Sequence, residues 1–153
     1  MILNIGDKAP TFCLPADDVD TLSLDDLKGR RLVLYFYPKN MSPGCTFQAL
    51  DFRDHANDFY NAGVSVVGVS RDSLKRHKNF KAKYNLGFTL ISDEKGELCE
   101  TYGVWQKKKL YGREYMGIVR TTFLIDSNGV IQKIWPKVNV KGHVKEVLAT
   151  VHA

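Results

Sequence analysis

Short runs of apolar residues alternate along the chain with longer stretches in which apolar residues recur at helical spacing. Residues 32–37 are apolar or aromatic at every position, which predicts a strand buried on both faces of a sheet. Pro38 ends this run. From Pro43 onward the apolar residues follow helical spacing up to Gly63, so we expect one helix that begins at Pro43 and ends at about Asn61.

The same reading predicts the remaining elements. An N-terminal hairpin is expected from strands around 12–14 and 21–24, which flank an acidic turn. After the long helix we expect a strand over 64–70, a helix from the capping residue Ser73 to 84, a strand over 89–91 and a short helix over 97–102. A long connection that contains glycine and lysine follows over 104–117. The chain then continues with a strand over 118–125, a hairpin turn over 126–129, a returning strand over 130–135 and a final helix over about 142–151.

This order of elements combines strand–helix–strand crossovers with a terminal antiparallel hairpin. It predicts an α/β protein of the thioredoxin-like class, with a central mixed sheet flanked by helices and an N-terminal β-hairpin extension. A length of 153 residues and the lack of internal repeats or linkers predict a single domain over 1–153.

Composition and charge are those of an ordinary globular chain, with 44% hydrophobic and 25% charged residues. The amino terminus lacks the pattern of a signal peptide and no run reaches the length of a membrane span, so we expect a cytoplasmic protein. The net charge of +5 comes mainly from residues 71–83 and 107–109. We interpret the first cluster as the solvated face of a helix and the second as a surface loop, rather than as nucleic-acid contacts.

Three cysteines, Cys13, Cys45 and Cys99, are widely separated and form no CxxC pair. The four histidines are scattered, and no Cys/His group has the spacing of zinc ligands. We therefore predict neither a metal site nor a cofactor.

Cys45 lies in the first turn of the helix predicted to begin at Pro43. Its sulfur is then close to backbone N–H groups that have no intrahelical acceptor and to the positive end of the helix dipole. A thiol in this position is expected to ionise more readily than a free cysteine. The position predicts thiolate chemistry.

Pro38, Ser42 and Cys45 form the pattern P-x-x-x-S-x-x-C directly after the buried strand. This pattern resembles the peroxiredoxin signature P-x-x-x-(T/S)-x-x-C, and YFYPKNMSPGCTFQALDFRD is similar to the peroxiredoxin Q, or bacterioferritin comigratory protein, subfamily. The resemblance includes GDKAPTFCLP, ISDEKGELCETYGVW and VRTTFLIDSNGVI and so covers essentially the whole chain. It implies a thiol-dependent peroxidase that reduces hydrogen peroxide and organic hydroperoxides to water and alcohols, in antioxidant defence and cell redox homeostasis.

The resemblance also implies roles for individual residues. Cys45 is expected to attack the peroxide and become a sulfenic acid. The hydroxyl of Ser42 and the backbone N–H groups of Gly44 and Cys45 are expected to orient the peroxide, and Pro38 to shield the sulfur from water. From its position alone, Ser42 could equally cap the helix.

Arg120, in GIVRTTFLID, matches the arginine that the family places beside the thiolate. A fixed cation there would stabilise negative charge on the sulfur and on the peroxide. Gln48 lies one helical turn after Cys45, on the same side of the helix, and is expected to hold Arg120 in place. Taken alone, Arg120 could also be an ordinary strand residue.

One departure from the family concerns the resolving cysteine. Many members have it five residues after the first, where this chain has Leu50, and others on the helix predicted over 73–84, which contains none. Cys99 and Cys13 are interpreted as structural residues. The chain is therefore expected to be a one-cysteine enzyme, resolved by thioredoxin, glutaredoxin or glutathione, and a monomer like many of its subfamily.

Three other functions remain as alternatives. Thioredoxin-like disulfide exchange is disfavoured because Cys45 has no CxxC partner. A non-enzymatic binding module is compatible with the fold, since fold alone does not define function. A cysteine hydrolase would need a histidine next to Cys45, and no motif places one there.

Overall fold

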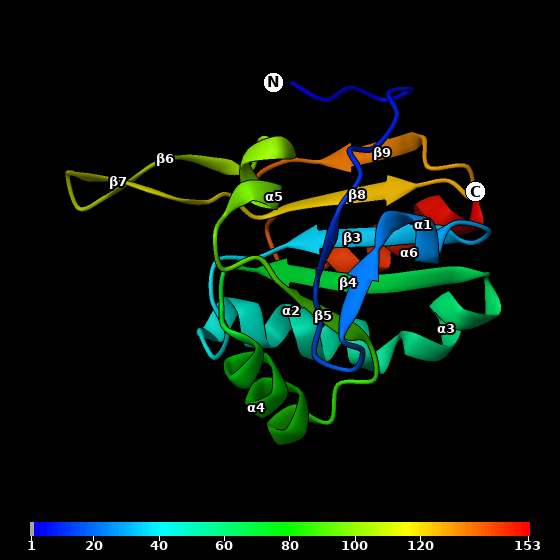
Figure 1. Cartoon of the computed structure of the whole chain (residues 1–153), viewed down its shortest axis with the longest axis horizontal. Helices are drawn as coiled ribbons and strands as arrows, with labels where there is room; N and C mark the ends of the chain where they lie inside the picture. Colours follow the sequence, from blue (N-terminus) through cyan, green and yellow to red (C-terminus); the bar gives the residue numbers. More distant parts are fainter. Residues whose placement is uncertain (1) are drawn as a thin grey trace.

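A five-stranded mixed sheet forms the centre of the chain in the computed structural model, which describes residues 2–153 (Figure 1). The strand order is β5-β4-β3-β8-β9, in which β3, β4 and β5 are parallel and β8 and β9 are antiparallel to their neighbours. The strands are β3 (Arg31–Phe36), β4 (Val64–Ser70), β5 (Thr89–Ser92), β8 (Thr121–Ile125) and β9 (Ile131–Trp135). The predicted central strand is confirmed as β3, which is buried from residue 32 onward.

Side chains of β3 alternate between two hydrophobic clusters on opposite faces of the sheet, because successive side chains of a strand point to opposite sides. Val33 and Tyr35 pack into one cluster with α2, α3, α4 and α6, and Leu34 and Phe36 pack into the other with α1 and α5. The helices are α1 (Leu24–Leu27), α2 (Pro43–Asp54), α3 (Ala56–Asn61), α4 (Leu74–Tyr84), α5 (Glu97–Thr101) and α6 (His143–His152).

Most of the predicted elements are present within one to three residues of their expected ends. They include the N-terminal hairpin of β1 (Cys13–Pro15) and β2 (Thr21–Ser23), α4 with its cap, and the β8–β9 hairpin. Ser73 caps α4 as predicted, since its Oγ accepts a hydrogen bond of 3.2 Å from the backbone N–H of Arg76. The charged face of α4 is exposed, in agreement with the prediction.

The prediction of one helix over 43–61 is wrong, because the chain breaks at His55 into α2 and α3. The backbone of His55 leaves the helical conformation, and its ring Nδ1 lies 2.8 Å from the carbonyl oxygen of Asp51. The break also lets Phe52 of α2 and Phe59 of α3 pack against each other, with ring centroids 5.8 Å apart. Both phenylalanines are fully buried.

The predicted strand around 21–24 is shorter than expected, because Ser23 begins a one-turn helix, α1. Oγ of Ser23 accepts from the N–H of Asp26, and the carboxylate of Asp26 accepts from the N–H of Ser23. This reciprocal pair is a capping box, which favours a helix start over continuation of the strand.

The long connection predicted over 104–117 is wrong: this segment is a β-hairpin formed by β6 (Trp105–Leu110) and β7 (Arg113–Ile118). Tyr111 and Gly112 form its turn with positive φ values of 51° and 77°, the combination that a type I′ turn requires. Most of its side chains are exposed on both faces, so the alternation that normally reveals a strand is missing. Lys107, Lys108 and Lys109 consequently lie on β6 and not in a loop.

A buried histidine connects α6 to the sheet. His143, the first residue of α6, is 3% exposed, and its Nε2 lies 2.8 Å from Oγ1 of Thr122 in β8. Its ring packs edge-on against Phe52 and Trp135. Burial lowers the pKa of His143 to about 4, an effect that the carboxylate of Glu146 opposes. The imidazole is therefore neutral in the folded protein at pH 7.

No helix within residues 2–153 has both the length and the apolar character needed to cross a membrane.

The buried imidazole of His143 predicts a loss of stability in mild acid. Its pKa lies below the ordinary value of 6.5, so the unfolded chain binds the proton first as the pH falls. The contribution of the neutral ring is complete above about pH 6.5 and is lost as the pH falls through 4, with a full effect of about 3 kcal/mol. Urea unfolding at several pH values between these limits should show that the free energy of unfolding falls more steeply with decreasing pH in the wild type than in His143→Gln. Equal slopes would contradict this role.

Candidate functional site

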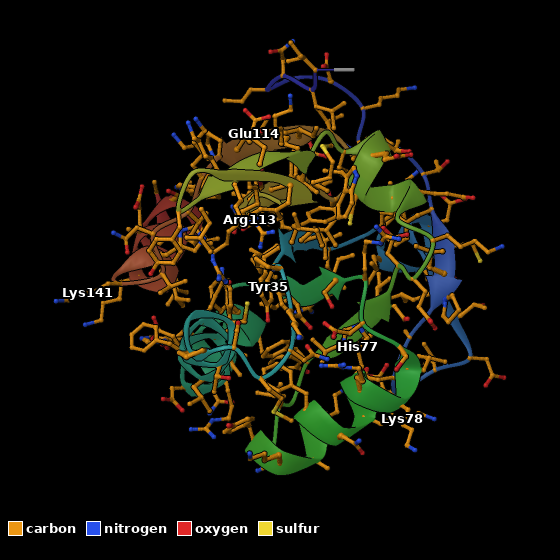
Figure 2. All side chains as sticks on the ribbon, turned by 90° about the vertical axis from the view of Figure 1, so that its left-hand side faces the viewer. Tyr35, His77, Lys78, Arg113, Glu114 and Lys141 are labelled. Carbon is orange, nitrogen blue, oxygen red and sulfur yellow. The ribbon has the colours of Figure 1, made fainter. Side chains whose placement is uncertain are left out.

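The register of two antiparallel strands brings Arg120 next to the start of α2. Cys45 follows the carboxyl end of β3, whereas Arg120 directly precedes β8. Phe36, the last residue of β3, lies opposite Thr121, the first residue of β8. The residue before Thr121 must therefore lie beside the segment that follows Phe36. Figure 2 views the molecule from this edge of the sheet.

Cys45 is the third residue of α2 and is only 1% exposed. Its Sγ accepts a hydrogen bond of 3.3 Å from Nη2 of Arg120. Gly44 precedes it in the same turn, and a Cβ atom at this position would lie 3.3 Å from the same Nη2. The first turn also carries backbone N–H groups that have no intrahelical acceptor. The sulfur is thus placed between a guanidinium group and the positive end of a helix.

Gln48 holds the other side of the same guanidinium group. It is fully buried, and its Oε1 accepts a hydrogen bond of 2.6 Å from Nη1 of Arg120. Because Cys45 and Gln48 are one helical turn apart, a single planar guanidinium can contact both. The geometry expected for this pair of residues is present.

Three buried polar atoms around this turn have no hydrogen-bond partner in the described part of the chain: Nε2 of Gln48, Oγ1 of Thr46 and the hydroxyl of Tyr35. Burial raises the pKa of Tyr35 well above its ordinary value, with a further contribution from charge at Cys45. Tyr35 stacks on Phe52, with ring centroids 4.6 Å apart. The sequence identified Tyr35 only as a strand residue, although alternation along β3 puts its side chain on the same face as those of Val33 and Tyr37, the face that packs against α2.

Ser42 and Pro38 belong to the loop between β3 and α2. Ser42 is the N-cap residue, but its hydroxyl makes no capping hydrogen bond and donates instead to the carbonyl oxygen of Lys39, at 3.1 Å. The alternative that the Ser42 side chain caps the helix is therefore wrong. Pro38 is half-buried directly after Tyr37. The structure brings the other predicted residues into contact and leaves these two on the loop that leads to Cys45.

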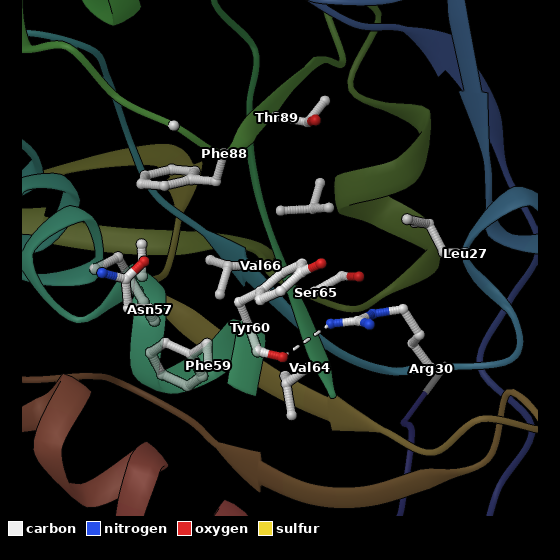
Figure 3. A pocket seen from close by; sticks show the side chains of 14 residues that line it. Leu27, Arg30, Asn57, Phe59, Tyr60, Val64, Ser65, Val66, Phe88 and Thr89 are labelled. Atoms are coloured by element: carbon white, nitrogen blue, oxygen red, sulfur yellow. Dashed lines mark hydrogen bonds between the residues drawn. The ribbon is translucent and has the colours of Figure 1, made fainter. Parts of the chain in front are cut away.

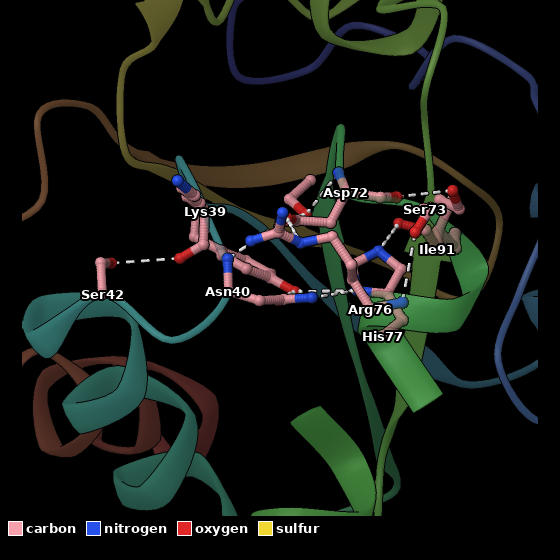
Figure 4. A network of polar contacts seen from close by, with 11 residues as sticks. Lys39, Asn40, Ser42, Asp72, Ser73, Arg76, His77 and Ile91 are labelled. Carbon is pink, nitrogen blue, oxygen red and sulfur yellow. Dashed lines mark hydrogen bonds and ion pairs between the residues drawn. The ribbon is translucent and has the colours of Figure 1, made fainter. Parts of the chain in front are cut away.

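A buried polar network anchors this loop to β4 and α4 (Figure 4). Asn40 is 2% exposed, and its backbone N–H donates to Oδ2 of Asp72 at 2.9 Å. The same carboxylate accepts from the hydroxyl of Ser70 at 2.6 Å and pairs with Arg76 at 3.1 Å. The loop is thus held through its backbone by groups that follow β4.

His77 of α4 completes the network and was not identified from the sequence. Its Nε2 lies 2.9 Å from the carbonyl oxygen of Ile91, so this nitrogen carries the proton and donates. Its Nδ1 then accepts from the side-chain amide of Asn40 at 2.9 Å, and Asn40 in turn accepts from the hydroxyl of Tyr37 at 2.6 Å. Burial lowers the pKa of His77, which keeps the ring neutral. Its spacing of three residues from Phe80 was the available signal that it faces inward.

The other two cysteines lie apart from Cys45. Cys99 is fully buried in the cluster on the opposite face of the sheet, which confirms the prediction of a packing role. Burial, reinforced by the Asp93 carboxylate, raises the pKa of the Cys99 thiol. Cys13 lies in β1, and the interpretation of this residue as structural is not supported because its side chain is exposed.

A surface groove lies beside α3 and β4. The groove, of about 520 Å³, is walled by Phe52, Tyr60 and Phe88, with Arg30 at its side (Figure 3). The guanidinium of Arg30 donates to the carbonyl oxygen of Tyr60 at 3.3 Å. None of the predicted site residues lines this groove. Within residues 2–153, no three His, Cys, Asp or Glu side chains are placed to share a metal ion.

A family model, curated relatives and solved structures all relate this chain to the peroxiredoxins. The model of the AhpC/TSA family matches residues 5–134. A putative peroxiredoxin bcp of Coxiella burnetii is 55% identical, over 97% of this chain and 98% of its own length, and peroxiredoxin Bcp of Bacillus subtilis is 50% identical, over 99% and 96%.

Solved structures agree with these matches. A Xylella fastidiosa PrxQ variant superposes with a TM-score of 0.94 at 36% identity, over 99% of this chain and 97% of that one. The bacterioferritin comigratory protein of Xanthomonas campestris, studied for its alkyl peroxide reduction activity, superposes with a TM-score of 0.87 at 40% identity, over 92% and 90%. These likenesses confirm the predicted α/β fold with its central mixed sheet and flanking helices.

The guanidinium contact predicts the reactivity of the Cys45 thiol. Arg120→Ala removes the donor to Sγ and should reduce the rate of alkylation of Cys45 by iodoacetamide at neutral pH about tenfold or more, because only the thiolate reacts. Gln48→Leu should give a smaller decrease, since Arg120 remains but loses its second partner. Peptide mass spectrometry over time measures both rates. Arg76→Ala is the control, since Arg76 pairs with Asp72 in the loop network. Unchanged alkylation in Arg120→Ala would show that the contact does not activate the sulfur.

Proposed function

The chain belongs to the AhpC/TSA family and is a peroxiredoxin enzyme, and we propose that Cys45 is the nucleophile with which it reduces peroxides. The observation that carries this proposal is the hydrogen bond of 3.3 Å from Arg120 to Sγ of Cys45 in the first turn of α2. Both features stabilise a thiolate, which is the form of cysteine that attacks peroxides.

In the proposed reaction the thiolate attacks one oxygen of the peroxide and the O–O bond breaks. The sulfur keeps that oxygen and becomes a sulfenic acid, so it is oxidised by two electrons. The other oxygen leaves with the electron pair and takes up a proton, which gives water from hydrogen peroxide or an alcohol from an organic hydroperoxide. Negative charge thus moves from the sulfur to the departing oxygen.

The residues around Cys45 suit this movement of charge. Arg120 is held by Gln48 at 2.6 Å, so its guanidinium needs no rearrangement to stabilise a developing negative oxygen. The first-turn N–H groups of Gly44 and Cys45, with the hydroxyl of Ser42, would hold the two peroxide oxygens in line with the sulfur. Pro38 would limit access of water to the sulfur from the loop side.

We propose that an external thiol resolves the sulfenic acid. Cys45 packs in the cluster on one face of the central sheet, and Cys99 in the cluster on the other face. Phe12 and Leu14, the two neighbours of Cys13 in the chain, pack against that second cluster. A disulfide requires Cα atoms within roughly 7 Å, so a layer of backbone stands between Cys45 and both possible partners.

An external thiolate would attack the sulfur of the sulfenic acid, form a mixed disulfide and release hydroxide, which takes up a proton. A second thiolate would then attack the mixed disulfide and return Cys45 as thiolate, so that two thiols supply the two electrons. Thioredoxin, glutaredoxin or glutathione would serve as this reductant. By resemblance to the subfamily, the proposed form is a monomer that acts in the cytoplasm.

The alternative functions lack the partners that they need. The three residues that follow Cys45 include no second cysteine for disulfide exchange. The two buried histidines face other groups, His77 toward Asn40 and Ile91 and His143 toward Thr122, so neither serves as a base for Cys45. Insulin reduction would identify disulfide exchange, and lack of peroxide consumption would favour a binding module.

Removal of the nucleophile tests the central proposal. Cys45→Ser should abolish consumption of hydrogen peroxide supported by dithiothreitol, because an alcohol is far less acidic than a thiol and is not oxidised by peroxide. Cys13→Ser and Cys99→Ser should retain most of the activity. Substantial turnover by Cys45→Ser, measured as peroxide loss over time, would overturn the assignment.

The resolution step predicts the product of a single oxidation. After one equivalent of peroxide, the intact mass should show one added oxygen, and dimedone should react with the sulfenic acid on Cys45. An added thiol should discharge this species to a mixed disulfide. A stoichiometric Cys45–Cys99 or Cys45–Cys13 disulfide in peptide maps would instead establish resolution within the chain.

A further inference from the structure

The β6–β7 hairpin extends from the body of the protein as a separate two-stranded sheet (Figure 1). Neither of its strands pairs with any other strand described. An isolated two-stranded hairpin is marginally stable in water, and its outer edges present unpaired backbone groups. Such an arm contributes little to a core and offers its surface to another molecule.

The base of this hairpin lies at the Cys45 site. β7 ends at Ile118, two residues before Arg120. Nζ of Lys108 donates a hydrogen bond of 3.0 Å to the carbonyl oxygen of Ile118. The stem of Lys108 lies over Gly117, where a Cβ atom would approach its Cδ to 3.1 Å. Burial and the charge of Arg120 lower the pKa of Lys108, and charge on Cys45 opposes this, so the ammonium group is within electrostatic reach of both.

Positive charge predominates on the hairpin and beside it. The hairpin carries four cations and one carboxylate, Glu114, which already pairs with Lys107 at 3.4 Å. Two more lysines lie next to the site. The carbonyl of Lys39 accepts from Ser42, and Lys137 precedes Val138, whose N–H donates to the Arg120 carbonyl. Such a surface attracts a partner that carries negative charge.

Large apolar side chains are exposed on the hairpin and beside Cys45. On the hairpin, Tyr111 is 97% exposed, Leu110 55% and Met116 50%. Next to Cys45 in the chain, Met41 and Phe47 are 40% and 49% exposed. Aromatic residues and methionine are enriched at protein interfaces, where their apolar area is removed from water. A surface that combines cations with large apolar side chains is suited to binding a protein rather than a small solute.

We propose that the β6–β7 hairpin is the docking surface for the protein that reduces oxidised Cys45, and that this partner presents its own cysteine within an acidic surface that also has apolar side chains. The inference rests on the proposed function, in which an external thiol resolves the sulfenic acid. Cys45 is 1% exposed, so a protein thiol can reach it only when the first turn of α2 opens. A docked partner stays in place during such openings.

Charge reversal on the hairpin tests this docking. The variant Lys109→Glu with Arg113→Glu changes two exposed hairpin cations, and its matched control is Lys75→Glu with Lys78→Glu on the exposed face of α4. Peroxidase turnover is measured with thioredoxin and with glutaredoxin as reductant, and separately with dithiothreitol. We expect kcat/KM for the protein reductant to fall about tenfold or more in the hairpin variant only. Turnover with dithiothreitol should stay within about twofold, and added salt should slow the protein-supported rate of the wild type.

Equal decreases in the hairpin variant and the α4 control would overturn the proposal, since net charge alone would then account for them. Turnover of the wild type with dithiothreitol but with neither protein would also overturn it. A wild-type dimer in sedimentation that the hairpin variant abolishes would assign the surface to a second copy. Absence of turnover with dithiothreitol would instead reject the proposed function, and matching thermal unfolding curves would exclude misfolding of the variant.

Discussion

The contact of one guanidinium group with two residues of α2 is the interaction on which the site depends. Arg120 donates to Sγ of Cys45 and to Oε1 of Gln48 from its two terminal nitrogens. Burial of a cation without partners would cost several kcal/mol, whereas hydrogen bonds to it return about 1.5–3 kcal/mol each. A thiolate sulfur is a better hydrogen-bond acceptor for the guanidinium than a neutral thiol sulfur. The need to satisfy the guanidinium and the need for a reactive sulfur are therefore met by the same hydrogen bond.

The sheet provides the fixed frame that this contact requires. β3 is covered on both faces, and its carboxyl end and the start of β8 are held in register by the antiparallel pairing of Phe36 with Thr121. A shift of one residue in that pairing would turn every β8 side chain to the opposite face. The loop between β3 and α2 is fixed separately, through Asn40, by Asp72 and His77. Both supports come from elements that are themselves deeply packed, so the geometry at Cys45 depends on the core as a whole.

The same sheet separates Cys45 from Cys99, which bears on the proposed catalytic cycle. With Cys45 on one face and Cys99 on the other, oxidation of the first leaves the second out of reach unless the core opens. The residue in the position of a resolving cysteine, Leu50, provides no alternative. In the proposed cycle the buried sulfur of Cys45 reacts with an external thiol, so the protein that carries this thiol needs a place to bind. The β6–β7 hairpin, whose outer part is exposed beside the Cys45 site, is available for that purpose.

Elements and residues that depend on neighbours in the chain could be predicted from the sequence alone. The run before Pro38 identified the central strand, and Pro43 with the helical spacing after it identified the start of α2, because strand burial and helix starts depend on neighbours in the chain. The sequence also pointed to Arg120 and Gln48 through resemblance, but it did not contain their distance from the sulfur.

Features that depend on contacts between distant segments became visible in the folded chain. The tertiary structure placed His77 and Tyr35 beside the site, since their partners lie on other elements. It turned residues 105–118 into a hairpin, because a strand exposed on both faces leaves no alternation to read. It broke the helix at His55 so that Phe52 and Phe59 could share one core, a requirement of packing that no local pattern expresses.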